Sequence, residues 1–181
     1  MEPYITEIVL QSKASIVHGD LLVLFDLLKS FDIENVLEIG TWKGFSMQNW
    51  TRAFPYANIV TVEKDKKNDQ CIEIEHENYY YLWGHDSQEE STLDEIINIF
   101  HQDFIDFIFI DGAHDLEGVT RDYERYGSLV RKGGIIVFHD ACYHADGTEE
   151  VDILWNELKR INSYVEIKTT PSSTGIGVIF K

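Results

Sequence analysis

The sequence predicts an α/β fold in which a mostly parallel sheet of seven strands is covered by helices on both faces. Short apolar runs, several of them rich in β-branched residues, alternate along the chain with segments whose apolar residues recur at helical spacing. Strands that are apolar throughout are typical of parallel sheets buried on both faces. The last two strands are separated by only a few turn residues, which indicates a C-terminal antiparallel hairpin.

Seven runs are predicted as strands. The first five are residues 35–40, 58–65, 79–84, 106–111 and 133–140, and the fifth is entered through a turn of two glycines. The last two are 164–170 and 175–181, which are joined by "PSST".

Helical spacing predicts helices at 20–31, 91–100, 116–130 and 149–161, with Ser91 as the N-cap of the second. The chain contains no internal repeat and no low-complexity linker. We therefore expect a single domain, 1–181, with an N-terminal helical segment (1–34) and a core (35–181).

Composition excludes several classes of partner. The 181 residues include 32 acidic and 15 basic ones, for a net charge of −17, so the surface would repel nucleic acid and anionic membranes. No apolar run approaches the roughly 20 residues that cross a bilayer. The N-terminus lacks the features of a secretory signal, and the two cysteines are Cys71 and Cys142. We expect a cytoplasmic protein with both thiols free.

Acidic residues lie at or near the ends of four predicted strands. Glu38 lies within the first, and Glu63, Asp111 and Asp140 lie at the ends of the second, fourth and fifth. Ligands of parallel α/β sheets bind beyond the carboxyl ends of the strands. The four carboxylates therefore predict a binding site at this edge.

The loop after the first strand predicts part of the ligand. Gly40 and Gly44 form a strand-to-helix turn that is not the GxGxxG dinucleotide pattern, and Glu38 beside it would oppose a pyrophosphate. A ligand with a cationic centre and an amino group suits this loop better. Glu63 follows Gly40 by 23 residues, near the spacing at which a carboxylate accepts both hydroxyl protons of a ribose.

A second group of polar residues is a candidate metal site. Asp111 ends the fourth strand, while His139 and Asp140 end the fifth, and adjacent strands lie about 4.8 Å apart. Two carboxylates suit Mg²⁺ or Ca²⁺, and the histidine admits Mn²⁺, Fe²⁺ or Zn²⁺.

Structural roles remain open for the same residues. Asp111 could cap the helix that begins near Leu116, His139 could orient Asp140, and His114 could hold its loop. A zinc site on His139, Cys142 and His144 is a weaker alternative. Asp122 is expected to pair with an arginine or to lie in solvent, and Trp42 to be core or pocket wall.

Five motifs in order produce a family resemblance: "VLEIGTWKGFS", "TVEKD", "GHDSQEE", "FIDGAHDLEGVTRDYE" and "GGIIVFHD". The chain resembles class I S-adenosylmethionine-dependent methyltransferases from about residue 35 to 181. More narrowly, it resembles the small "FIDGxHxYxxVxxD" group of cephalosporin-hydroxylase-like proteins and sugar O-methyltransferases, although Leu116 replaces the tyrosine. The resemblance implies a Rossmann-like methyltransferase sandwich that binds S-adenosylmethionine.

The resemblance also assigns residues. It places the acid after the second strand, Glu63, at the ribose, and Asp86 with Ser87 at the adenine. The glycine loop beside the methionine part of the cofactor falls on Glu38, Gly40, Thr41, Gly44 and Ser46.

Similarity to metal-dependent O-methyltransferases of the catechol type implies Asp111, His139 and Asp140 as ligands of Mg²⁺ or Mn²⁺. His139 stands where those enzymes have an acid. The basic residue three positions after the first aspartate, which takes the proton of the acceptor, would be His114.

The expected function is therefore O-methylation of a small molecule or sugar, with a divalent metal assisting. Two alternatives are binding of S-adenosylmethionine without methyl transfer and a hydroxylase-like reaction on the same fold. The expected partner is a small-molecule acceptor, neither nucleic acid nor membrane, and a homo-oligomer that completes an open site stays an option.

Overall fold

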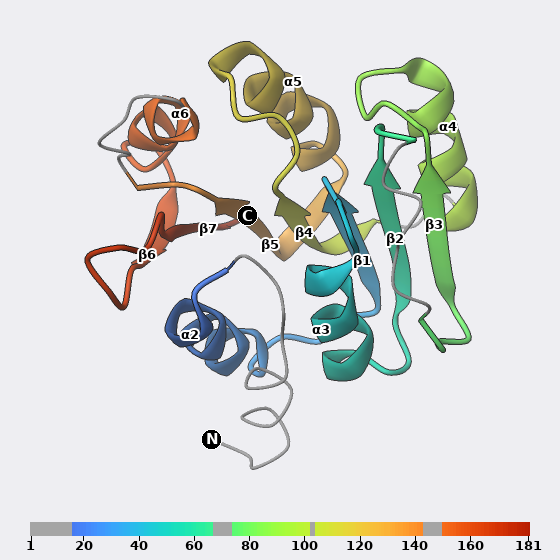
Figure 1. The fold of residues 1–181 in the computed structure, drawn as a ribbon, viewed down its shortest axis with the longest axis horizontal. Coiled ribbons are helices and arrows are strands. Elements are labelled where there is room, and N and C mark those ends of the chain that lie inside the picture. Colours follow the sequence, from blue (N-terminus) through green and yellow to red (C-terminus); the bar gives the residue numbers. More distant parts are fainter. Residues whose placement is uncertain (1–15, 67–73, 102–103, 143–149) are drawn as a thin grey trace.

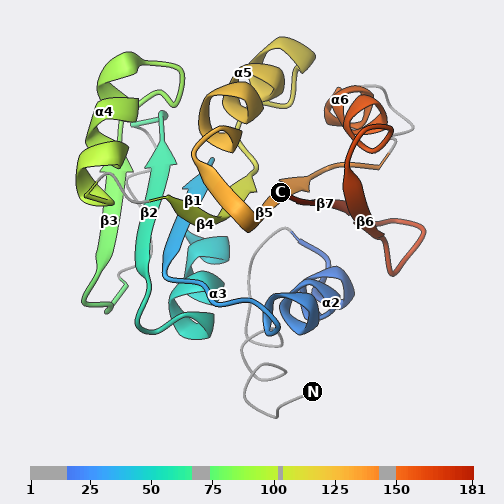
Figure 2. The same cartoon turned by 180° about the vertical axis from the view of Figure 1, so that it is seen from behind.

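A seven-stranded sheet with helices on both faces forms the body of the protein (Figures 1 and 2). The computed structural model describes residues 16–66, 74–101, 104–142 and 150–181. The strands are β1 (Asn35–Ile39), β2 (Asn58–Glu63), β3 (Tyr79–Trp83), β4 (Ile105–Ile110), β5 (Val130–His139), β6 (Ser163–Ile167) and β7 (Ile176–Phe180). The helices are α2 (His18–Leu28), α3 (Phe45–Ala53), α4 (Glu90–Ile99), α5 (Leu116–Gly127) and α6 (Val151–Leu158).

The sheet order is β3-β2-β1-β4-β5-β7-β6. The first five strands pair in parallel, whereas β7 is antiparallel to both β5 and β6. This arrangement confirms the predicted fold class and the C-terminal hairpin. The predicted start of the fifth strand is wrong: β5 begins at Val130, and Gly133 and Gly134 lie inside it, where its register against β4 shifts.

Two apolar layers explain why the central strands are apolar throughout. Alternate residues such as Ile108 and Ile110 face the core under α4, α5 and α6. Their neighbours Phe107 and Phe109 face α2 and α3, where both rings lie 5.2 Å from the ring of Trp50. Since both faces of these central strands are buried, both carry apolar residues, and polar and apolar residues do not alternate along them as they do in a half-exposed strand.

The centre of the sheet contains a switch point. β1 lies between β2 and β4, so the connections that follow β1 and β4 diverge at the carboxyl edge. The two loops touch there: a Cβ on Gly40 would lie 2.1 Å from the carbonyl oxygen of Asp111, and Gly40 has φ +88°. Glycine is therefore required at this crossing by a backbone neighbour as well as by its own conformation.

Two predicted helix caps are wrong. The N-cap of α4 is Glu89, not Ser91, because the helix begins one residue earlier than expected. Asp115 caps α5 by accepting a hydrogen bond from the backbone N–H of Gly118 at 2.9 Å. The alternative in which Asp111 caps this helix is therefore excluded, and Asp111 is left for the site.

Several predictions fall outside the described residues, namely those on Cys71, His144 and the first 15 residues of the N-terminal segment. Cys142 is buried and forms no disulfide with a described residue. None of the helices in the described ranges has both the length and the apolar character needed to span a bilayer.

Candidate active site

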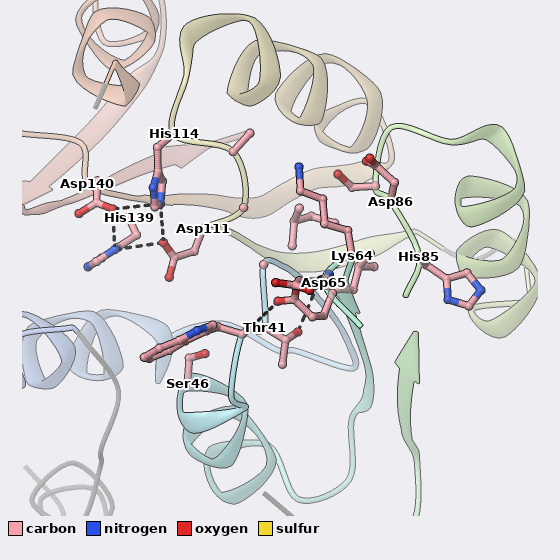
Figure 3. A pocket seen from close by; sticks show the side chains of 18 of the residues that line it. Thr41, Ser46, Lys64, Asp65, His85, Asp86, Asp111, His114, His139 and Asp140 are labelled. Carbon is pink, nitrogen blue, oxygen red and sulfur yellow. Dashed lines mark hydrogen bonds and ion pairs between the residues drawn. The ribbon is translucent and has the colours of Figure 1, made fainter. Parts of the chain in front are cut away.

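A pocket of about 610 Å³ opens at the carboxyl edge of the sheet, around the switch point (Figure 3). Every predicted site residue except Glu38 and Gly44 lines it. These residues are Gly40, Thr41, Ser46, Glu63, Asp86, Ser87, Asp111, His114, His139 and Asp140.

The glycine loop is held against the end of β2. The backbone N–H groups of Gly40 and Thr41 donate to the carbonyl of Val62 at 3.0 and 3.2 Å. Trp42 has φ +47°, an uncommon conformation for a bulky residue, and its ring is half exposed along the pocket wall. Of the predicted roles for Trp42, that of pocket wall is confirmed. Gly44 has φ +80° and is the N-cap of α3, so it shapes the loop without lining the pocket.

Glu38 lies beneath this loop with no exposed surface. Its Oε1 accepts a hydrogen bond from the indole N–H of Trp50 at 2.8 Å. Its Oε2 is buried and accepts no hydrogen bond of ordinary geometry from the residues that the structure describes. Burial raises the pKa of Glu38 to about 7. The Ser46 hydroxyl, the Trp50 indole and the Thr41 hydroxyl oppose this rise by favouring the charged form, and the charge of Asp111 adds a small further rise.

Glu63 points a fixed carboxylate at the pocket. Its Oε2 accepts the backbone N–H of Trp42 at 2.6 Å, and its Oε1 accepts that of Asp65 at 2.7 Å. Because a carboxylate oxygen accepts more than one hydrogen bond, both oxygens keep acceptor capacity toward the pocket. This geometry suits a ligand with two neighbouring hydroxyl groups.

The loop after β3 forms the wall beyond Glu63. Its first N–H, that of Gly84, donates to the carbonyl of Glu63 at 2.6 Å, and Asp86 closes a turn by accepting the N–H of Gln88 at 2.9 Å. The hydroxyl of Ser87 donates to Asp122 at 2.7 Å. The prediction that Asp122 lies in solvent is wrong, because its side chain is buried. The charge of Arg125 acts on Asp122, as the arginine alternative expected, but the hydrogen bond of Asp122 is to this loop.

The predicted metal ligands meet on the other side of the pocket (Figure 3). Nδ1 of His139 lies 3.1 Å from Oδ1 of Asp111 and 3.1 Å from Oδ2 of Asp140. One ligand atom from each of the three residues lies within 4.8 Å of the other two. Asp140 has φ +56°, which turns its carboxylate back toward β4 as the chain leaves β5. Aspartate tolerates this conformation better than most residues.

Charge holds this cluster together. Burial alone would lower the pKa of His139, but the charge of Asp111 and hydrogen bonds to Asp111 and Asp140 raise it to about 10. Burial alone would raise the pKa of Asp140, whereas its hydrogen bonds and charge interaction with His139 lower it. The two carboxylates of this cluster already attract a positive charge, as ligands of a divalent cation do, whereas His139 would lose its proton on binding such an ion, because only the neutral imidazole is a ligand.

His114 lies beside the same two carboxylates and is more exposed than they are. Its Nε2 is 3.7 Å from Oδ1 of Asp111 and 3.5 Å from Oδ2 of Asp140. The imidazole therefore joins the acidic cluster to the exposed part of the pocket lining.

Some pocket residues were not predicted. Thr174, in the turn between β6 and β7, lines the pocket and hydrogen-bonds to Asp140. Lys64, Asp65 and His85 extend the wall near Glu63. Nothing in "PSST" distinguishes Thr174 from any other turn residue, because only the strand order brings this turn beside β5. Cys142 is not part of the metal-binding group found among the described residues, and the zinc alternative also needs His144, which lies outside them.

Comparisons with known proteins identify the family of the chain. A family model described as "Methyltransferase domain" matches residues 37–141. An uncharacterized protein of Acanthamoeba polyphaga mimivirus is 29% identical over 131 residues, which cover 65% of this chain and 57% of that protein. The chain spans a little over half the length of the curated relatives it matches.

Solved structures share the fold. The O-methyltransferase from Bacillus cereus in complex with SAH has a TM-score of 0.63 at 20% identity, over 100% of this chain and 92% of that chain. The MycE methyltransferase of the mycinamycin pathway, solved with Mg, SAH and mycinamycin VI, has a TM-score of 0.70 at 18% identity. That match covers 99% of this chain and 55% of the other.

Proposed function

The chain belongs to the methyltransferase-domain family, and on that premise we propose that it transfers a methyl group from S-adenosylmethionine to an oxygen atom of a small-molecule acceptor. One observation supports this proposal most strongly: two sites line the same pocket. They are Glu63, which suits a ribose, and the Asp111–His139–Asp140 cluster, which suits a divalent cation. The two halves would bring the cofactor and the acceptor together.

The cofactor would lie along the β1, β2 and β3 ends. The carboxylate of Glu63, fixed by two backbone N–H groups, would accept the ribose hydroxyls. Asp86 and Ser87 would face the adenine, and Gly40, Thr41 and Ser46 the methionine part. The buried Oε2 of Glu38 lies beneath the loop, and a cationic ligand above the loop would favour the charged form of this acid and so lower its raised pKa.

The acceptor would lie at the acidic cluster. Asp111, His139 and Asp140 would hold Mg²⁺ or Mn²⁺. Such an ion, when bound, lowers the pKa of a coordinated hydroxyl. His114 would accept the hydroxyl proton, and the carboxylates of Asp111 and Asp140, 3.7 and 3.5 Å from its Nε2, would stabilise the imidazolium that results.

The acceptor class follows from the pocket and the relatives. The negative charge of the chain favours a neutral or cationic acceptor over an anionic one. The structural neighbour solved with Mg, SAH and mycinamycin VI supports a small-molecule acceptor. From the sequence resemblance we propose that the chain is a member of the narrower "FIDGxHxYxxVxxD" group of sugar O-methyltransferase-like proteins and that its partner is neither nucleic acid nor membrane.

Calorimetric titration with S-adenosylmethionine, with and without Mg²⁺ or Mn²⁺, tests both halves of the proposal. Wild type is compared with Glu63→Ala and Asp111→Asn. Glu63→Ala should weaken cofactor binding by at least about tenfold, since it removes a charged acceptor of two hydrogen bonds. Asp111→Asn should leave cofactor binding intact and abolish the effect of the metal.

Turnover then separates the alternatives. Formation of S-adenosylhomocysteine with a panel of hydroxylated acceptors would support transfer, whereas binding without turnover would favour a cofactor-binding protein. A requirement for oxygen and iron would favour the hydroxylase-like reaction. Absence of cofactor binding under every metal condition would overturn the proposal.

A further inference from the structure

A buried acid on α5 lies behind the pocket wall. Asp122 is 1% exposed, and its Oδ1 accepts the hydroxyl of Ser87 at 2.7 Å. Its Oδ2 is buried without a hydrogen-bond partner in the described part of the chain. Asp122 does not line the pocket itself, and the hydrogen bond that links it to the pocket wall is the one to Ser87.

The same helix holds this loop at further points. The hydroxyl of Tyr126, a fully buried residue one turn after Asp122, donates to the carbonyl of Ser87 at 2.5 Å. Arg121 donates to the side chain of Gln88 at 3.1 Å, and Arg125 lies 3.6 Å from Glu90. The side chain and the carbonyl of Ser87 are thus both fixed by α5, while the sheet holds the start of the loop at Gly84.

A carboxyl in this position is a poor choice for stability alone. Burying an acid is unfavourable unless its oxygens are paired, and one oxygen of Asp122 has no partner among the described residues. Burial raises the pKa of Asp122 to about 6, which shows that its charged form is disfavoured in the fold. What the carboxyl does achieve is a defined orientation of Ser87, which does line the pocket.

We propose that Asp122 is a positioning residue for the cofactor: with Tyr126 it fixes the 84–88 loop in the shape that receives the adenine end. This inference rests on the proposed function, because it takes the ligand of that loop to be the nucleoside of S-adenosylmethionine. It differs from a role in the acidic cluster, since Asp122 makes no hydrogen bond to Asp111, His139 or Asp140 within the described residues.

Calorimetry with S-adenosylhomocysteine tests the inference, with Mn²⁺ titrated separately. Asp122→Ala should weaken S-adenosylhomocysteine binding about tenfold, the effect of one lost hydrogen bond that ordered the site. Mn²⁺ binding should stay unchanged. Asp122→Asn keeps an oxygen that can accept from Ser87, so it should restore affinity to within about threefold of wild type.

The matched control is Asp106→Asn. Asp106 is also buried, but it accepts the backbone N–H groups of Glu34 and Asn35 at the opposite edge of the sheet. Its substitution should lower the melting temperature without changing the affinity for S-adenosylhomocysteine. Equal affinity of wild type and Asp122→Ala would overturn the inference, as would a parallel loss of Mn²⁺ binding.

The remaining outcomes separate this inference from the proposed function. If Asp122→Ala does not fold, Tyr126→Phe removes the second contact to Ser87, and unchanged affinity in that variant overturns the inference. If wild type itself binds no S-adenosylhomocysteine, the proposed function fails and this inference fails with it. Binding by wild type and by Asp122→Ala alike would instead refute the role of Asp122 and leave the proposed function standing.

Discussion

Glu38 combines complete burial with an ionisable side chain. It lies in β1 between apolar neighbours, with one oxygen bonded to Trp50 and the other without a partner in the described chain. Such a group is stable as the neutral acid and disfavoured as the carboxylate. The sequence indicated an acid near the cofactor but not its depth, because its distance from solvent depends on the helix that covers it.

The protonation of Glu38 should make stability depend on pH. Its pKa is raised from 4.5 to about 7 in the fold, so the folded state binds more protons between these values and stability falls as pH rises through them. The free energy of unfolding of wild type should fall by roughly 3 kcal/mol relative to Glu38→Gln between pH 4.5 and 7.5. Urea denaturation across this range measures the difference.

An exposed acid provides the comparison for Glu38. Glu157→Gln on α6 removes one carboxylate from the surface, so its pH profile should run parallel to that of wild type. Parallel profiles for wild type and Glu38→Gln as well would contradict the buried, neutral acid.

At the scale of elements, α2 is joined to the C-terminal hairpin by one acid. Asp20 is buried, and its Oδ1 accepts both the backbone N–H and the hydroxyl of Thr169 at 2.6 Å. Its Oδ2 accepts the hydroxyl of Ser173. The packing is close, since a Cβ on Gly19 would lie 2.4 Å from the Thr169 hydroxyl oxygen. Through Ser173 this contact also steadies Thr174 in the pocket wall.

Removing the Asp20 carboxylate should weaken the attachment of the β6–β7 hairpin to α2. Asp20→Ala should lower the free energy of unfolding by about 3 kcal/mol, because it deletes three hydrogen bonds to a buried carboxylate and leaves the backbone N–H of Thr169 without its acceptor. Asp26→Ala on the same helix is the control: Asp26 is exposed and only pairs with Lys29 at 3.4 Å, so its loss should change stability by less than about 1 kcal/mol. Equal losses in the two variants would refute the link.

The elements themselves were predictable because their signal is local. The apolar strands and the hairpin followed from runs of residues, and the residues at the strand ends placed most of the pocket before any fold was known. Asp122 and Thr174 were not predictable in their roles. Their partners, Ser87 and Asp140, lie 35 and 34 residues away along the chain and become neighbours only through the packing of α5 and the order of the strands.

At the scale of the whole molecule, the large negative net charge dominates the electrostatic contribution to stability. With 32 acidic and 15 basic residues, repulsion among carboxylates exceeds the attraction of the ion pairs. Raising NaCl from 0.01 to 0.15 M shortens the Debye length from ~30 to ~8 Å, so it should raise the free energy of unfolding. Chemical denaturation at a series of NaCl concentrations measures this, and a fall in stability with salt would mean that specific ion pairs dominate.

The position of β7 has a consequence for the order in which the chain folds during synthesis. β7 lies between β5 and β6 and is the only described strand that pairs with β6, although β6 precedes it in the chain. During synthesis β6 must therefore wait for β7, and the two enter the sheet as one unit, bringing Thr174 to the pocket with them. Almost the entire described chain must therefore be synthesised before the pocket is complete. A ligand that needs the whole pocket binds only those molecules that have finished folding.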